Sequence, residues 1–137
     1  MTRAEERRQR ERVICAMGWI QRKIGSAFHF EFTSTRETER LAIDQTFRGR
    51  EDPDSFLVSF NPDLTAKVPF RVLRADALHE WLHAVDWPCY SRVFDRLPER
   101  ERARFKDEWH ASVYRKERAF APLVLGTPRA HLRELES

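Results

Sequence analysis

The first 25 residues show a helical pattern of apolar positions. These positions recur at intervals of three and four, which places them on one helical face: Val13, Met17, Ile20 and Ile24. We therefore expect an amphipathic helix over residues 2–25, ended by Gly25. Its first part, residues 1–12, is a charged and net basic arm. We interpret these charges as a solvated helix face, with contact to nucleic acid as the alternative.

Strands are predicted next. Residues 28–32 and 56–60 carry apolar side chains at every second position, which is the period of a half-buried strand. Residues 41–47 are a further strand candidate, separated from the last strand by the polar turn 48–54. Asn61-Pro62-Asp63 closes the last strand. The pattern predicts a short three-stranded sheet.

Prolines bound the two remaining helices. One helix is expected to begin near Pro69, since proline is tolerated in a first turn, and to stop one or two residues before Pro88. A long last helix is expected over residues 98–124, followed by a tail at 126–137. The order helix, three strands, two helices predicts one α+β domain over residues 1–137.

The second predicted helix carries the pentapeptide His79-Glu80-Trp81-Leu82-His83. Histidines four residues apart on a helix lie one turn apart on one face, so their imidazoles can bind one zinc ion. Glu80, one residue along, is placed to act as general base. It would accept a proton from a zinc-activated water and pass it to a leaving amine. The pentapeptide therefore predicts a zinc-dependent hydrolase.

Residues 77–84, Ala-Leu-His-Glu-Trp-Leu-His-Ala, resemble the active-site helix of the zincin metallopeptidases, and the resemblance extends over roughly residues 55–124. It implies a zincin-like fold, a Zn²⁺ cofactor and a protein or peptide substrate. It also implies that the strand Ser55–Asn61 forms the edge of the active-site cleft, where an extended peptide pairs with it.

A catalytic zinc needs a third protein ligand, and Glu117 is our first candidate. Glu117 falls at the edge of the apolar stripe of the last helix, where a carboxylate needs a compensating partner. That stripe consists of Phe105, Trp109, Val113, Phe120 and Val124. Residues 116–121 also resemble the ligand helix of the gluzincin branch, and particularly that of the ImmA/IrrE-like peptidases.

Three other residues remain candidates for this ligand. Glu108 lies away from the centre of the stripe, which favours a solvated position. His110 lies near the Glu117 side, and SprT-like peptidases complete their site with a downstream histidine. Cys89 follows His83 by six residues, the spacing of the third ligand in metzincins, and thiolate binds zinc well.

Further side chains are expected to support the metal and the reaction. Asp86 lies three residues after His83 and is a candidate to accept the free ring N–H of a ligand histidine. His110 and Tyr114 are candidates to donate a hydrogen bond to the transition state. Ordinary surface or core roles are the alternatives for all three.

Composition narrows the class of protein. The net charge of +3 and a pI of 9.2 permit contact with nucleic acid without requiring it. Residues 1–12 contain no apolar secretory segment, no apolar run approaches a membrane span, and the two cysteines are far apart. We expect a cytoplasmic endopeptidase without membrane attachment. The alternatives are a DNA-associated SprT-like protein and a non-catalytic binding module with the zincin fold.

Overall fold

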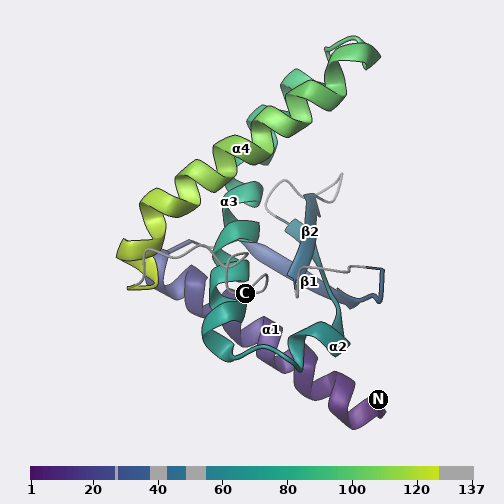
Figure 1. Cartoon of the computed structure of the whole chain (residues 1–137), viewed down its shortest axis with the longest axis vertical. Coiled ribbons are helices and arrows are strands. Elements are labelled where there is room, and N and C mark those ends of the chain that lie inside the picture. Colours follow the sequence, from purple (N-terminus) through teal and green to yellow (C-terminus); the bar gives the residue numbers. More distant parts are fainter. Residues whose placement is uncertain (27, 38–42, 49–54, 127–137) are drawn as a thin grey trace.

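The computed structural model describes residues 1–26, 28–37, 43–48 and 55–126, with residues 43–48 and Ser55 described by their backbone alone (Figure 1). The expected tail at 126–137 lies outside this description beyond Gly126. The described elements, in chain order, are α1 Arg3–Ile24, β1 His29–Ser34, β2 Ile43–Arg48, β3 Ser55–Phe60, α2 Pro62–Thr65, α3 Phe70–Phe94 and α4 Glu99–Val124. Helices dominate over one small sheet, so the α+β class is confirmed.

Helix α1 agrees with its predicted bounds to within one residue at each end. It begins with a capping box, in which the Thr2 hydroxyl accepts from the Glu5 N–H and the Glu5 carboxylate accepts from the Thr2 N–H. It ends at Gly25, whose φ of 85° is strained for any residue with a Cβ. The buried face holds Val13, Met17 and Ile20, as the apolar spacing predicts, whereas Ile24, which the same spacing places on this face, is 36% exposed.

The sheet has the strand order β1-β3-β2, with β1 parallel and β2 antiparallel to β3. The expectation that Ser55–Asn61 forms a cleft edge is therefore wrong. Strand β3 is hydrogen-bonded on both sides, so its backbone groups are already paired with β1 and β2. Strand β2 takes an edge position, and it packs beside α3. The central position of β3 could not be read from the order of the strands along the chain. After β2, the chain returns to the centre of the sheet and inserts β3 between β1 and β2.

The middle of α3 is buried on nearly all sides. Between Val72 and Ala84 only Arg74 and Trp81 are partly exposed. A helix enclosed in this way has no solvent face, so polar residues in it face neighbouring elements. The surrounding core is formed by apolar residues of α1, β3, α3 and α4: Val13, Met17, Ile20, Phe56, Val58, Phe60, Leu73, Leu78, Leu82 and Val113. This enclosure places the histidine pentapeptide in the interior.

Helix α3 continues through Pro88 to Phe94, so the predicted stop before that proline is wrong. An internal proline costs a helix about 3 kcal/mol, because it lacks an N–H and crowds the preceding turn. Packing against α4 offsets this cost, since the Tyr90 ring stacks on Trp109 at 3.7 Å and on Phe105 at 5.4 Å between centroids. In Figure 1 the paired ends of α3 and α4 extend beyond the sheet.

Two smaller features complete the described fold. The predicted turn at Asn61-Pro62-Asp63 begins the one-turn helix α2, capped by Asn61, whose side chain accepts from the Asp63 N–H at 3.0 Å. The Arg12 guanidinium of α1 donates to the carbonyl oxygens of Thr65 and Val68 and ties α1 to this turn. Within the described ranges, no helix combines the length and apolarity that a bilayer span requires.

Candidate metal centre

His79 and His83 meet on the face of α3 that packs against α4. Their Nε2 atoms lie 3.0 Å apart, and the two residues are only 3% and 6% exposed. The four-residue spacing on a regular helix brings the rings together, as predicted. Two nitrogens bound to one tetrahedral zinc ion, each at about 2.0–2.1 Å, lie about 3.3 Å apart. The pair therefore has close to the separation that a shared metal requires.

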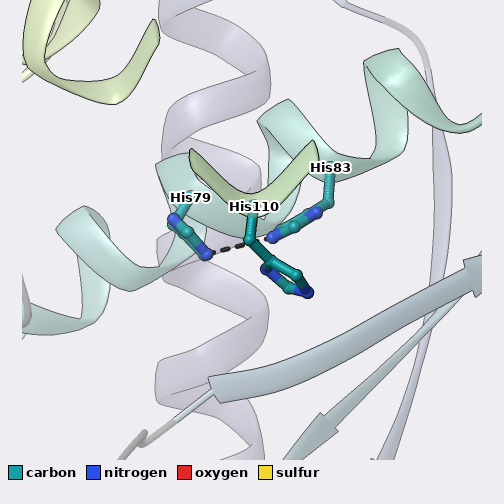
Figure 2. A group of neighbouring side chains, drawn as sticks. All are labelled: His79, His83 and His110. Atoms are coloured by element: carbon teal, nitrogen blue, oxygen red, sulfur yellow. Dashed lines mark hydrogen bonds between the residues drawn. The ribbon is translucent and has the colours of Figure 1, made fainter. Parts of the chain in front are cut away.

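His110 comes to this pair from α4. One ring nitrogen from each of His79, His83 and His110 lies within 4.8 Å of the others. Figure 2 shows the first two histidines projecting side by side from α3 and His110 reaching in from α4. Three imidazoles are a donor set that zinc accepts in catalytic sites, where a fourth position stays open. The residues present therefore fit a zinc ion.

Glu117 contacts the same cluster from a different side. It is 1% exposed, and its Oε2 lies 2.8 Å from Nδ1 of His79, whereas Nε2 of that ring faces His83. A carboxylate at Nδ1 accepts the ring N–H and leaves the Nε2 lone pair for a metal. The core-facing position predicted for Glu117 is confirmed. Its contact favours orienting His79 over binding the metal directly, and the ligand assignment stays a prediction.

Two further acidic residues of α3 are buried. Glu80 is 3% exposed and Asp76, one helical turn before it, is 1% exposed. With Glu117, three buried carboxylates therefore lie on α3 and α4. Buried carboxylates need compensating charge or hydrogen bonds. Sequence reasoning missed Asp76, although an aspartate flanked by Ala75, Ala77 and Leu78 was a detectable signal.

No protein-family model, curated protein or solved structure matches this chain.

Aromatic rings enclose the two histidines of α3. The Tyr114 ring lies 4.8 Å from that of His79, and the Trp109 ring lies 4.5 Å from that of His83. Tyr114 is thus brought to the centre, where the sequence expected it. Trp109 was assigned only to the apolar stripe of α4. Its place beside His83 depends on the pairing of α3 with α4, which the stripe does not specify.

The structure separates three other candidates from the cluster. Asp86 accepts through both oxygens from Lys116 Nζ, at 2.7 and 2.6 Å, and this ion pair replaces the expected contact with a ligand histidine. Glu108 is exposed and paired with Arg104 at 3.1 Å, as expected of a solvated residue. Cys89 is an exposed free thiol. Because α3 does not turn at Pro88, Cys89 points about 240° around the helix from His83.

Proposed function

We propose that this protein is a zinc-dependent hydrolase in which His79, His83 and His110 hold the metal. The observation that carries the proposal is the convergence of three imidazoles within 4.8 Å, two of them buried. Glu80, which follows His79 in the chain, is itself buried. A metal ion bound by all three rings would account for their convergence.

Zinc bound there would act as a Lewis acid and lower the pKa of a water in its open position. The chain's own residues supply the rest. Glu80 accepts a proton from the attacking water and transfers it to the leaving group. Glu117 holds the proton on His79 Nδ1 and thereby keeps the Nε2 lone pair directed at the metal. Glu80 is the catalytic residue, and Glu117 is a positioning residue.

A peptide bond is the substrate we propose, and the zincin fold is part of the same proposal. Its support is the resemblance of residues 77–84 to the zincin active-site helix. The edge strand β2 packs beside α3 and offers backbone groups for pairing with an extended peptide. We keep the cytoplasm as the proposed location, because Cys15 and Cys89 are free and exposed thiols, which suits a reducing compartment.

Zinc titration of the metal-free protein, combined with a peptide hydrolysis assay, tests this proposal. We expect about one zinc per chain, a rise in thermal stability on zinc addition, and hydrolysis that a chelator removes. If the wild-type protein binds zinc but cleaves no peptide, and Glu80→Gln binds zinc equally well, the protein is a binding module and not an enzyme. Failure to bind zinc at all would reject both.

A second candidate function, contact with nucleic acid, is favoured by a pocket on α1. The pocket has a volume of about 430 Å³ and is lined in part by Arg3, Arg7 and Arg10. Its one acidic residue, Glu6, is paired with Arg36. Arginine binds phosphate well, and such binding weakens steeply with salt. Replacing the three pocket arginines with Gln should then reduce the salt dependence of oligonucleotide binding. Absence of binding at low salt would reject this candidate.

A further inference from the structure

The pocket on α1 lies between that helix and one edge of the sheet. We call it the arginine pocket, and its volume is about 430 Å³. The sheet contributes Ser34 and Phe60, the last residues of β1 and β3, which are aligned with each other in the parallel pair. The other described lining residues belong to the first half of α1. The pocket is therefore bounded by a helix on one side and by two strand ends on the other.

Three arginines of α1 point into the same sector of the helix surface. Arg3, Arg7 and Arg10 follow one another at intervals of four and three residues, and all three are exposed. At 100° and 1.5 Å per residue, they fall within about 60° of one another and span about 10 Å along the helix. Their guanidinium groups line one pocket and are not spread over the surface of the helix.

The positive charge of these three arginines is not compensated. Glu6 also lines the pocket, but its carboxylate is paired with Arg36, which binds Asp63 as well. Among the residues that the structure describes, none of the three pocket arginines has an ion-pair or hydrogen-bond partner. Three like charges in one pocket repel one another, and a bound anion relieves this repulsion.

Arg12 of the same helix shows the contrasting case of an arginine that stabilises the fold. It lies about 180° around α1 from Arg3. Its guanidinium donates to the carbonyl oxygens of Thr65 and Val68 at 2.6 and 2.8 Å. The pocket arginines make no contact of this kind, so they are available to a ligand.

The number of unpaired guanidinium groups indicates the kind of anion. A phosphate monoester carries a charge of about −1.5 to −2 at pH 7 and has three terminal oxygens that accept hydrogen bonds. A carboxylate or a phosphodiester carries a single negative charge and has two such oxygens. Guanidinium groups bind phosphate through two parallel hydrogen bonds. Three of them in one pocket therefore favour the monoester.

We propose that the arginine pocket binds a phosphate monoester through Arg3, Arg7 and Arg10, with the Ser34 hydroxyl as a further donor. The lining contains none of the residues assigned to the metal centre, so this inference does not depend on the hydrolase. It rests on the second candidate function where the monoester is the terminal phosphate of a nucleic-acid strand. The other source of the same group is a small phosphorylated compound.

Binding of two oligonucleotides that differ by one phosphate tests the proposal. The zinc-loaded full chain is titrated at low salt with octathymidylate that carries a 5′-phosphate and with the same strand without it. The phosphorylated strand should bind on the order of tenfold more tightly, because only it offers the monoester. Inorganic phosphate should compete with it, and acetate at the same ionic strength should not. Equal affinity for the two strands, without binding of inorganic phosphate, would overturn the proposal.

A charge-matched pair of variants locates the phosphate. Replacing all three pocket arginines with Gln should remove the preference for the 5′-phosphate and the binding of inorganic phosphate. The control variant replaces three exposed arginines outside the pocket with Gln and should keep both: Arg92, Arg96 and Arg100. Both variants lose three positive charges and keep the zinc ligands. A preference that survives in the pocket variant would place the phosphate elsewhere, for instance on zinc, and would overturn the proposal.

A single conservative substitution gives a second, milder test. Arg7→Lys keeps the positive charge but loses the planar fork that holds two phosphate oxygens, so it should lower the preference for the 5′-phosphate severalfold. Full preference in Arg7→Lys together with full preference in Arg7→Gln would show that this residue does not hold the phosphate and would contradict the three-arginine site.

The same titrations separate this inference from the proposed functions. Equal binding of both strands at low salt, without binding of inorganic phosphate, overturns the monoester site and leaves contact with nucleic acid. Binding of inorganic phosphate in the pocket, without binding of either strand, supports the monoester site and rejects nucleic acid in favour of a small phosphorylated compound. No binding of any phosphate probe overturns the inference, and peptide hydrolysis by the zinc-loaded protein is unaffected by each of these results.

Discussion

Glu117 of α4 lies with its Oε2 2.8 Å from Nδ1 of His79 on α3, and both side chains are buried. The contact joins the two helices at the candidate metal centre, on the Nδ1 side of His79, while Nε2 of the same ring faces His83. It distinguishes two accounts of the centre. In the first account, Glu117 accepts the Nδ1–H of His79 and orients this ligand without touching the metal. In the second account, Glu117 binds the metal as the third ligand.

Replacing Glu117 with Gln should weaken zinc binding about 10- to 100-fold without abolishing it, as expected when a partner that orients a ligand loses its charge. Isothermal titration of folded protein with zinc measures this change. Glu108→Gln, an exposed carboxylate on the same helix, is the control and should have no effect. Loss of zinc as complete as in His79→Ala would instead make Glu117 a ligand.

Replacing Glu80 with Gln should leave zinc affinity within a fewfold range and lower kcat by about 10²- to 10⁴-fold, because the general base is removed while the ligands remain. Zinc stoichiometry and peptide hydrolysis are measured on the same preparation. Full activity in this variant would show that Glu80 is not the base.

Replacing Pro88 with Ala should raise the free energy of unfolding by about 1–3 kcal/mol, because alanine restores an N–H within the continuous helix α3. Denaturant unfolding measures the change. Pro62→Ala is the matched control, since Pro62 occupies the first turn of α2, where proline is favourable, and its loss should bring no gain. A destabilised Pro88→Ala would mean that α3 depends on a distortion at this residue.

Tyr90 should make stability depend on pH in the alkaline range. Burial, with a smaller effect of the Asp95 carboxylate, raises the pKa of the Tyr90 hydroxyl above its usual value of 10.0. The folded chain then keeps this proton at a pH where the unfolded chain loses it. The contribution is present below the unfolded pKa and is lost as the pH rises through the folded pKa. Tyr90→Phe lacks it.

Unfolding free energies of wild type and Tyr90→Phe, measured at about pH 9 and about pH 11, test this effect. The advantage of wild type over Tyr90→Phe should shrink at the higher pH. A difference between the two proteins that stays constant would show that the hydroxyl titrates equally in both states.

The local part of the fold could be predicted from the sequence, and the long-range part could not. The apolar spacing of α1 and α4 sets their bounds, because helix formation along an amphipathic face is local. The central place of β3 depends on pairing with two strands elsewhere in the chain. The passage of α3 through Pro88 likewise depends on Tyr90 stacking against Trp109, residues from two helices whose pairing the sequence does not state.

The candidate site likewise has a local part that the sequence predicts and a long-range part that it does not. The proximity of His79 and His83 follows from helical spacing. The burial of Glu117 was predicted from its place at the edge of the apolar stripe of α4, although Phe120 of that stripe is 45% exposed. The proximity of His110 and the contact of Glu117 with Nδ1 depend on how far α4 is shifted along α3. That shift is set by packing over the whole helix pair, so the choice among the candidate ligands stayed open until the pairing was described.

Zinc binding by His110→Ala tests the proposed metal centre most directly. His110 is the one ligand that distinguishes the three-histidine set from the alternatives, in which another residue completes the pair His79 and His83. Wild type should bind about one zinc per chain, and His110→Ala should lose tight binding while staying folded by circular dichroism. Exposed His29, which lies on β1, supplies the control substitution and should keep wild-type affinity. Wild-type zinc affinity in His110→Ala would contradict the account.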